Sequence, residues 1–278
     1  MHPERRGEAG KAGATFRNAV TSARVAVALS GAAVPRAMTD RAIVVGASSG
    51  IGEALAHELA ADGYEVGLAA RRLERLEDIG GDLPTKAYVA RMDVTDTEEA
   101  RDRLRRLVDA MGGCDLLVLS AGVGDLNPDL DWDPERRTID VNVRGFTALA
   151  TLGMEVFAEQ GSGHLVGISS VTSNFGNGAA PAYNASKAYV CRYLEGLRYW
   201  ADNADADITV TDVEPGYVDT KMALGDRQFW MASPETAAAQ IADAIRDRRR
   251  HVYVTRRWRL VAWLLRLLPE RALSRLFA

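Results

Sequence analysis

The sequence predicts an α/β protein built on a doubly wound, mostly seven-stranded parallel sheet with helices on both faces, followed by an amphipathic C-terminal helical tail. Three observations predict it. Short β-branched runs alternate with helical patterns from Arg41 onward. A glycine-rich turn joins the first run to the first helical pattern. The composition, 47% hydrophobic and 26% charged over 278 residues, is typical of an ordinary globular chain. Because the crossovers between parallel strands are right-handed, such a sheet is doubly wound, with helices on both of its faces.

The first half of the pattern gives three strands and three helices. "RAIVV" (41–45) is β-branched, and "GIGEALAHELAADG" after it repeats apolar residues at helical spacing. "EVGLA" (65–69) is the second strand, and "RRLERLEDI" the helix that follows it. "KAYVARM" (86–92) is the third strand, and "DTEEARDRLRRLVDAM" is a charged amphipathic helix.

The second half continues the alternation. Strands are expected at 115–120, 164–169, 207–213 and 251–254. A long helical region should follow Pro134, and "APAYNASKAYVCRYLEGLRYWA" should be a helix. The next helix, "SPETAAAQIADAIRD", opens on Ser233 as its N-cap with Pro234 at its first position.

Three segments are expected along the chain. Residues 1–37 are rich in Gly, Ala and Arg without a sustained period, which predicts a disordered extension or an upstream start with Met38 as the natural one. Ser30 and Gly31 break the apolar run, so this stretch makes a poor signal peptide. Residues 38–255 form the α/β domain and residues 256–278 the basic amphipathic tail. No run approaches the ~18 to 20 apolar residues of a membrane span.

Composition excludes several function classes. The net charge is −4, so nothing suggests nucleic-acid binding. Cys114 and Cys191 form no CxxC pattern and are expected as buried thiols in apolar surroundings, which fits a reducing, cytoplasmic setting. The four histidines show no close pairing, and no metal site is expected.

The turn after the first strand reads "GASSGIG". Gly46, Gly50 and Gly52 allow a tight turn, close backbone approach to a pyrophosphate, and a helix whose free N–H groups face negative charge. Ser48 and Ser49 add hydroxyl donors. The alternative is a glycine-rich turn that binds no ligand.

The residue that reads the ribose of a dinucleotide falls about 20 positions after the glycines. Arg71 and Arg72 lie there, and no Asp or Glu does. A guanidinium matches a 2′-phosphate, so we expect NADP(H) rather than NAD(H). Alternatively, the arginines are a solvated first helical turn.

Asp93, after the third strand, could accept the adenine amino group or be a turn residue.

The glycine turn, "SAG" (120–122), "DVNVRG" (140–145), "ISS" (168–170), "YNASK" (183–187) and "EPGYVDT" (214–220), in this order, strongly resembles the single-domain short-chain dehydrogenase/reductase family with its Rossmann-type fold. The resemblance runs from about Arg41 to Val254. Two positions depart from the family pattern: Val45 stands where Thr is frequent, and Leu119-Ser120 stands where Asn-Asn is frequent. In the family both positions form structural hydrogen bonds, so these departures affect local rigidity more than catalysis.

The resemblance implies four catalytic residues: Asn142, Ser170, Tyr183 and Lys187. Tyr183 would be the general acid/base. Lys187, one helical turn on, would lower the tyrosine pKa together with the positive charge of the oxidised nicotinamide, and could also hold the nicotinamide ribose. Ser170 would bind the substrate oxygen, and Asn142 would hold a relay water. Tyr217 and Lys221 have the same spacing as Tyr183 and Lys187 but follow a chain turn. Thirteen residues before Tyr183 lies Ser170, whereas thirteen residues before Tyr217 lies Ala204, which has no hydroxyl.

The cofactor-binding residues expected from the turn and from the resemblance are Gly46, Ser48, Ser49, Gly50, Ile51, Gly52, Arg71, Arg72, Asp93, Val94, Ala121, Gly122, Tyr183, Lys187, Pro215, Gly216, Val218 and Thr220.

The substrate wall is expected after Thr220, where Met222, Leu224, Phe229, Trp230 and Met231 would form a lid over a moderately apolar carbonyl or alcohol, or else fill core or a subunit interface. The resemblance implies a homodimer or homotetramer, in which the helix carrying Tyr189, Tyr193, Leu194, Leu197 and Trp200 packs against a partner.

The tail "RRWRLVAWLLRLLPERALSRLFA" could lie on a membrane surface, cap the core or a partner subunit, or shield a substrate entrance.

The sequence thus predicts an NADP(H)-dependent oxidoreductase that interconverts a carbonyl and an alcohol, with a small-molecule substrate. Two alternatives are an epimerase or dehydratase of the same fold, and a redox sensor that binds NADP(H) without turnover. The epimerase and dehydratase relatives usually carry a longer C-terminal substrate domain, and the complete Ser, Tyr and Lys set argues against a sensor.

Overall fold

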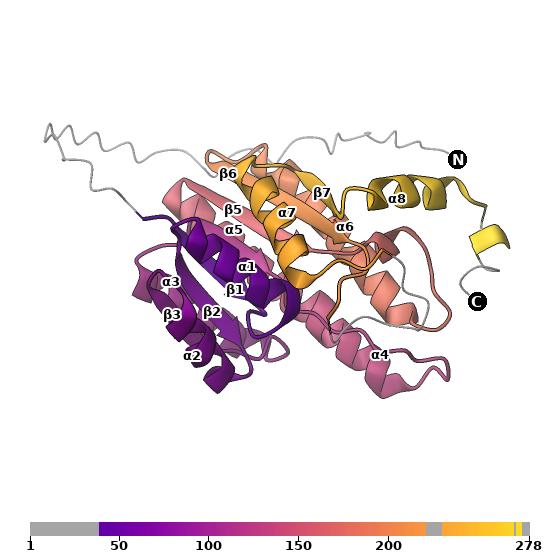
Figure 1. Cartoon of the computed structure of the whole chain (residues 1–278), viewed down its shortest axis with the longest axis horizontal. Helices are drawn as coiled ribbons and strands as arrows, with labels where there is room; N and C mark the ends of the chain where they lie inside the picture. Colours follow the sequence, from indigo (N-terminus) through magenta and orange to yellow (C-terminus); the bar gives the residue numbers. More distant parts are fainter. Residues whose placement is uncertain (1–38, 221–229, 270, 274–278) are drawn as a thin grey trace, which may run out of the picture. The chain divides into compact units, whose positions relative to one another are not determined.

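A computed structural model describes residues 39–220, 230–269 and 271–273, which lie in one compact unit, Thr39–Ala278. The predicted extension at residues 1–37 lies outside the described residues. The unit is an α/β domain in which a single twisted sheet is covered by helices (Figure 1).

The sheet has seven strands in the order β3-β2-β1-β4-β5-β6-β7, and every neighbouring pair is parallel, which confirms the predicted doubly wound sheet. The strands are β1 (Arg41–Val45), β2 (Glu65–Ala70), β3 (Ala87–Arg91), β4 (Leu116–Leu119), β5 (Ser162–Ile168), β6 (Asp207–Pro215) and β7 (His251–Val254). The chain order reverses between β1 and β4. Ligands of such sheets bind at that switch, beyond the carboxyl ends of the strands.

The helices form two layers. α1 (Gly50–Ala61), α2 (Leu73–Asp82) and α7 (Pro234–Arg246) pack their apolar residues on one face of the sheet. α3 (Thr97–Met111), α5 (Phe146–Gln160) and α6 (Pro181–Ala201) cover the other face. Figure 1 shows α1 and α7 running next to each other over the same face, where they contact one another.

Local signals explain where several helices begin and end. Ser233 caps α7 by accepting a hydrogen bond from the Thr236 N–H at 3.1 Å, with Pro234 at the first position as predicted. Asp96 caps α3 in the same way, and Gly112 ends that helix in the left-handed conformation at φ 76°.

The long helical region predicted after Pro134 is three segments rather than one helix. α4 (Trp132–Ile139) leads into a π-helical turn, Asp140–Gly145, and then into α5. A side chain at Gly145 would place its Cβ 2.5 Å from the Val94 carbonyl oxygen, so the turn packs directly on the chain leaving β3. Such π-helical turns are frequent at functional sites, and this one carries Asn142.

The C-terminal helix α8 (Trp258–Leu267) packs on the domain through Trp258, Ala262 and Leu265, all of which are buried. It contacts β7 and the short 3₁₀ helix η2 (Val171–Asn174). Among the helices that the structure describes, none has the length and apolar character needed to cross a membrane.

Candidate active site

The glycine turn that follows β1 is packed closely against neighbouring segments. Gly46 has φ +91°, and a Cβ there would lie 2.5 Å from the backbone nitrogen of Ala121. Gly50 has φ +60°, and its Cβ would lie 3.0 Å from the Thr220 methyl group. Both positive φ values and both close approaches favour glycine. The turn therefore lies against the chain after β4 and the loop after β6, three segments that were predicted to contact the cofactor.

The start of α1 presents backbone donors at this turn. Ser49 is the N-cap residue in an extended conformation, and its side chain forms no cap hydrogen bond. The first N–H groups of α1 are therefore not satisfied by that hydroxyl, and they point out of the turn with the positive end of the helix dipole. This arrangement suits a pyrophosphate.

Arg72 reaches back over the same turn. Its guanidinium donates hydrogen bonds to the Ser48 carbonyl oxygen at 2.9 Å, to Ser48 Oγ at 2.9 Å and to Ser49 Oγ at 3.0 Å. The sequence pattern did not predict these bonds, which give Arg72 a role in holding the turn. Arg71 is exposed and forms no hydrogen bond with other described residues, so its guanidinium is free to meet an anion.

Asp93 follows β3 and is fixed by its neighbour. Its Oδ1 accepts hydrogen bonds from Thr95 N at 3.0 Å and from Thr95 Oγ1 at 2.8 Å. Partial burial raises the pKa of Asp93, but the two Thr95 hydrogen bonds and the nearby charge of Arg71 outweigh it and leave the pKa lowered. The carboxylate is thus ionised and positioned next to Arg71.

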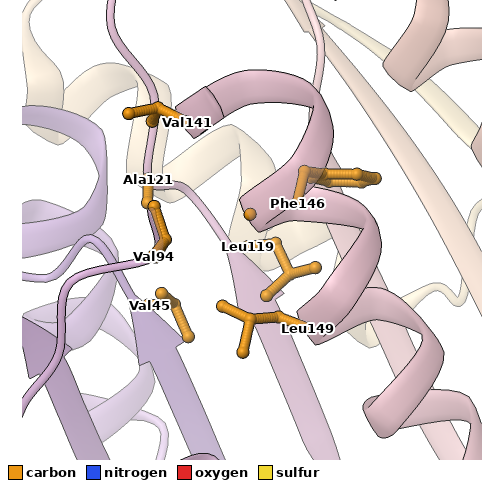
Figure 2. A pocket seen from close by; sticks show the side chains of 8 residues that line it. Val45, Val94, Leu119, Ala121, Val141, Phe146 and Leu149 are labelled. Carbon is orange, nitrogen blue, oxygen red and sulfur yellow. The ribbon is translucent and has the colours of Figure 1, made fainter. Parts of the chain in front are cut away.

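A small apolar hollow lies beneath the strand ends on the α5 side of the sheet (Figure 2). Its lining residues are Val45, Val94, Leu119, Ala121, Val141, Gly145, Phe146 and Leu149. Val94 and Ala121 were predicted to contact the cofactor. Because their side chains line this interior space, a ligand above the strand ends would meet mainly their backbone.

Ser170 and Tyr183 meet at the end of β5. Ser170 begins η2, is buried, and its Oγ accepts a hydrogen bond from Thr172 Oγ1 at 3.0 Å. Burial raises the pKa of Tyr183, while a hydrogen bond between its side chain and that of Ser170 lowers it in part. The net shift is upward, and the predicted lowering, which depends on Lys187 together with the positive charge of an oxidised nicotinamide, stays a prediction. In this geometry Tyr183 is a phenol at neutral pH.

Lys187 lies beside this pair, on the same face of α6. Its Nζ is 5.8 Å from the centre of the Tyr183 ring and donates a hydrogen bond to the Ile168 carbonyl oxygen at 2.9 Å. Burial lowers the pKa of Lys187 to about 8, and the charge of Asp212 partly opposes this. At neutral pH Lys187 is therefore still mostly protonated and places a positive charge near the Tyr183 ring.

Replacing Lys187 with methionine is expected to stabilise the ligand-free protein. The unfolded lysine has a pKa of 10.5 and the folded one about 8, so the unfolded state binds more protons between these pH values and the free energy of unfolding rises with pH there. The gap corresponds to about 3 kcal/mol at neutral pH. Urea unfolding from pH 7 to 10.5 should show this rise in the parent and its loss in Lys187→Met, with the exposed Lys86→Met as the control. An unchanged slope in Lys187→Met would contradict the perturbed lysine.

Asn142 is buried in the π-helical turn and joins three segments. Its Oδ1 accepts from Val123 N at 2.9 Å, and its Nδ2 donates to the Val123 carbonyl oxygen at 2.8 Å and to Ser186 Oγ at 2.9 Å. Ser186 Oγ in turn donates to the Tyr183 carbonyl oxygen at 2.7 Å. Both side-chain N–H groups are thus used within the protein, and a relay water would have to bind an Asn142 oxygen.

The loop after β6 carries the remaining predicted cofactor residues. A Cβ on Gly216 would overlap the Trp258 indole, so α8 packs directly on the turn that starts at Pro215. Val218 pairs with Ala232 in an isolated bridge. The ring of Tyr217 meets the ring of Trp258 edge to face at 5.5 Å.

Part of the predicted substrate wall cannot be placed. Lys221, Met222, Leu224 and Phe229 lie outside the described residues. Trp230 and Met231 are described, and both are substantially exposed.

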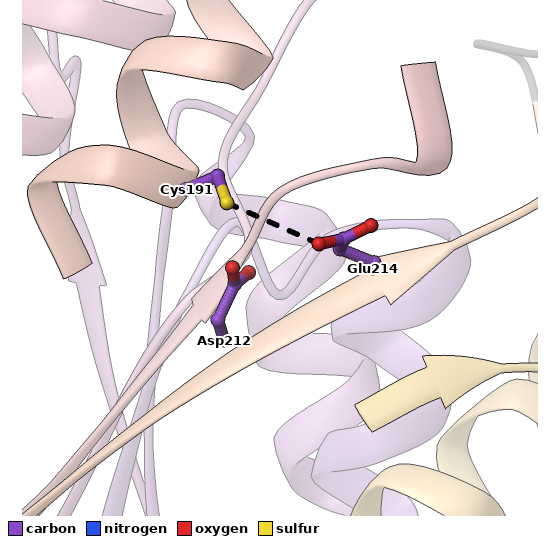
Figure 3. A group of neighbouring side chains, drawn as sticks. All are labelled: Cys191, Asp212 and Glu214. Atoms are coloured by element: carbon purple, nitrogen blue, oxygen red, sulfur yellow. Dashed lines mark hydrogen bonds between the residues drawn. The ribbon is translucent and has the colours of Figure 1, made fainter. Parts of the chain in front are cut away.

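Two buried carboxylates lie behind Lys187 and were not predicted. Asp212 and Glu214 of β6 point toward Cys191 of α6, and one ligand atom from each of the three lies within 4.8 Å of the others (Figure 3). The expectation of apolar surroundings for Cys191 is therefore wrong, whereas Cys114 is buried within an apolar cluster. The alternation in "TDVEP" places both acids on one face of a strand, which is the signal that could have revealed them.

The electrostatics of this cluster are set by burial. Burial raises the pKa of Asp212, although Ser169 Oγ donates a hydrogen bond to its Oδ1 at 2.5 Å. Glu214 is held by His251 Nε2 at 2.8 Å and accepts from Asn174 Nδ2 at 3.2 Å. Burial and the two acids raise the pKa of the Cys191 thiol to about 12, so the thiol stays protonated and unreactive.

Comparison with known sequences gives one family. The family model described as short chain dehydrogenase matches residues 40–229. An uncharacterized oxidoreductase of Mycobacterium tuberculosis is 35% identical over 247 residues, which cover 85% of this chain and 96% of that protein. An uncharacterized oxidoreductase of Myxococcus xanthus is 36% identical over 186 residues, covering 65% of this chain and 73% of that protein.

Solved structures agree with this similarity. A 3-ketoacyl-ACP reductase from Sinorhizobium meliloti superposes with a TM-score of 0.69 at 28% identity, covering 76% of this chain and 96% of that one. A short-chain dehydrogenase from Streptomyces avermitilis superposes with a TM-score of 0.69 at 27% identity, covering 78% and 88%.

Proposed function

The chain belongs to the short-chain dehydrogenase/reductase family of oxidoreductases, and on that premise we propose that it interconverts a carbonyl compound and an alcohol by NADP(H)-dependent hydride transfer. The observation that carries the proposal is the convergence of Ser170, Tyr183 and Lys187 at the end of β5. They supply a hydrogen-bond donor, a proton donor and a cation around one position.

The protein residues handle the proton while the cofactor handles the hydride. A bound nicotinamide supplies or accepts the hydride at the carbonyl carbon. Tyr183 gives its proton to the carbonyl oxygen, and the Ser170 hydroxyl hydrogen-bonds that oxygen as negative charge develops. Lys187 stabilises the phenolate left on Tyr183 and can bind ribose hydroxyls. Asn142 positions Tyr183 through Ser186.

The residues around the glycine turn fit a phosphorylated dinucleotide. The Gly46 and Gly50 turn, the uncapped α1 N-terminus and the guanidiniums of Arg71 and Arg72 offer backbone and cationic donors to phosphates. No carboxylate follows β2 where a ribose 2′-hydroxyl would be bound. This supports NADP(H) over NAD(H), and Asp93 is proposed to accept the adenine amino group.

Tyr183 can serve either direction of the reaction. As a phenol it donates a proton to a carbonyl oxygen, and as a phenolate, favoured by a nearby positive charge, it accepts a proton from an alcohol. We propose that the substrate is a moderately apolar carbonyl compound or alcohol.

Two other functions were considered for the fold. An epimerase or dehydratase would also use Tyr183 and Lys187, and a redox sensor would bind NADP(H) without turnover. The complete donor set at Ser170 and Tyr183 supports turnover.

We further propose a homodimer or homotetramer and a cytoplasmic enzyme. On α6, Trp200 is 49% exposed and suits a subunit contact, whereas Leu194 is fully buried within its own chain.

Consumption of NADPH with a panel of aldehydes and ketones tests the function. We expect turnover of at least one apolar carbonyl with NADPH, and at least ~10-fold lower kcat/KM with NADH because the 2′-phosphate contacts are lost. NADPH binding without consumption of any carbonyl would favour the sensor. Interconversion of substrate without net cofactor oxidation would favour the epimerase.

A further inference from the structure

The C-terminal helix is apolar on two opposite faces. Its inner face, Trp258, Ala262 and Leu265, is buried against the domain. Its outer face, defined here as Leu260, Trp263, Leu264 and Leu267, is 70%, 61%, 54% and 61% exposed. Single exposed apolar side chains are ordinary, but four large ones within eight residues of one helix form a patch that marks an interaction site.

The charge around the outer face is one-sided. The segment 255–269 carries four arginines and no acidic residue in a chain whose net charge is −4. Arg256, Arg257 and Arg259 are exposed, and within the part of the chain that the structure describes no carboxylate pairs with them. On α3, by contrast, arginines form ion pairs with carboxylates. Arg101 pairs with Glu155, and Arg105 pairs with Glu159.

We propose that the outer face of α8 binds the surface of an anionic lipid membrane. The outer face offers apolar side chains including a tryptophan, and the arginines beside it form no ion pair with a carboxylate among the described residues. This combination matches a membrane surface, where charged headgroups overlie acyl chains. A second copy of this chain matches it poorly, because a two-fold interface would bring the arginines of both copies together. The helix lies in the plane of the interface and does not span it.

The position of α8 connects this surface with the catalytic residues. Trp258 packs against the Gly216 turn, and its ring meets the ring of Tyr217 at 5.5 Å. The helix also contacts η2, which begins directly after Ser170. Trp230 is also exposed, and its ring lies 6.2 Å from the ring of Trp258 and 5.4 Å from the Arg257 guanidinium.

Docking through the outer face would hold the catalytic domain at the lipid surface by a helix that contacts the Gly216 turn and η2. Given the proposed carbonyl reduction, on which this step rests, the substrate is a long-chain aldehyde or ketone that partitions into the bilayer. Membrane binding itself does not depend on that reaction.

Co-sedimentation of the full chain with vesicles tests the proposal. Binding is expected to vesicles of phosphatidylcholine with about 30% phosphatidylglycerol, to fall steeply with salt, and to be weak with phosphatidylcholine alone. The double variant Trp263→Ser/Leu264→Ser should lose about tenfold or more in partitioning, as should Arg256→Gln/Arg259→Gln. The matched control Arg103→Gln/Arg106→Gln removes two exposed charges on α3 and should bind as the parent does.

The outcomes separate the two proposals. Absence of binding by the parent, or equal binding by Trp263→Ser/Leu264→Ser, would overturn the membrane surface. Loss of a dimer in that variant without vesicle binding by the parent would assign the patch to a second copy. Turnover of a short, water-soluble carbonyl should be unchanged in the variant. If no carbonyl is reduced but vesicle binding holds, the proposed function fails and the membrane surface stands.

Discussion

Replacing Tyr183 with phenylalanine is expected to lower kcat for carbonyl reduction by about 10³-fold, because the substrate oxygen loses its proton donor. The ring keeps its place on α6, and only the hydroxyl that bonds Ser170 is removed. NADPH affinity should therefore change little. The measurement is kcat and KM at pH 7 with the best carbonyl substrate, together with NADPH binding followed by tryptophan fluorescence.

Tyr217→Phe is the matched control, since "YVDTK" repeats the spacing of "YNASK". The Tyr217 ring packs on Trp258, and phenylalanine preserves that contact. Tyr217 also contributes to the raised pKa of Tyr183, so kcat should change, but far less than in Tyr183→Phe. Turnover by Tyr183→Phe at the parent rate would remove Tyr183 from the mechanism. A large loss in Tyr217→Phe alone would move the proton donor to the loop after β6.

The fold was predictable because each strand carries its own signal. β1 and β7 begin and end at the predicted residues, and the other strands differ by only one or two residues at either end. The tight turn at Gly46 and Gly50 was predictable for a steric reason, because positive φ and close neighbours exclude larger side chains there. These constraints act over a few residues, and a sequence records them directly.

What sequence reasoning missed depends on contacts between distant segments. The buried Asp212–Glu214 pair meets Cys191 only because β6 packs under α6 in one register, and no local pattern specifies that register. The upward shift in the pKa of Tyr183 has the same origin, because the burial that causes it depends on all the segments packed around the side chain. The π-helical turn at Asn142 has no propensity signal, and it follows from packing Gly145 on the backbone at Val94.

The second large effect, on cofactor affinity, is expected from replacing the arginines that follow β2. Arg71→Ala is expected to raise the Kd for NADPH by about 10- to 100-fold, the value of one or two charge-assisted hydrogen bonds, and to leave NADH binding unchanged. Arg71 is exposed and unbonded among the described residues, so its removal should not disturb the protein. Binding of both cofactors by isothermal titration calorimetry measures the difference.

Arg72→Ala should behave differently although it removes the same charge one residue away. Arg72 bonds the Ser48 carbonyl and the hydroxyls of Ser48 and Ser49, so its loss should loosen the turn and weaken NADPH and NADH together. Arg106→Ala is the control, because this exposed arginine on α3 pairs with Asp102 at 2.9 Å, away from the turn. Equal losses for NADPH and NADH in Arg71→Ala would contradict a 2′-phosphate contact. A loss confined to NADPH in Arg72→Ala would transfer that contact to Arg72, since only a direct phosphate interaction can distinguish two cofactors that share the same pyrophosphate.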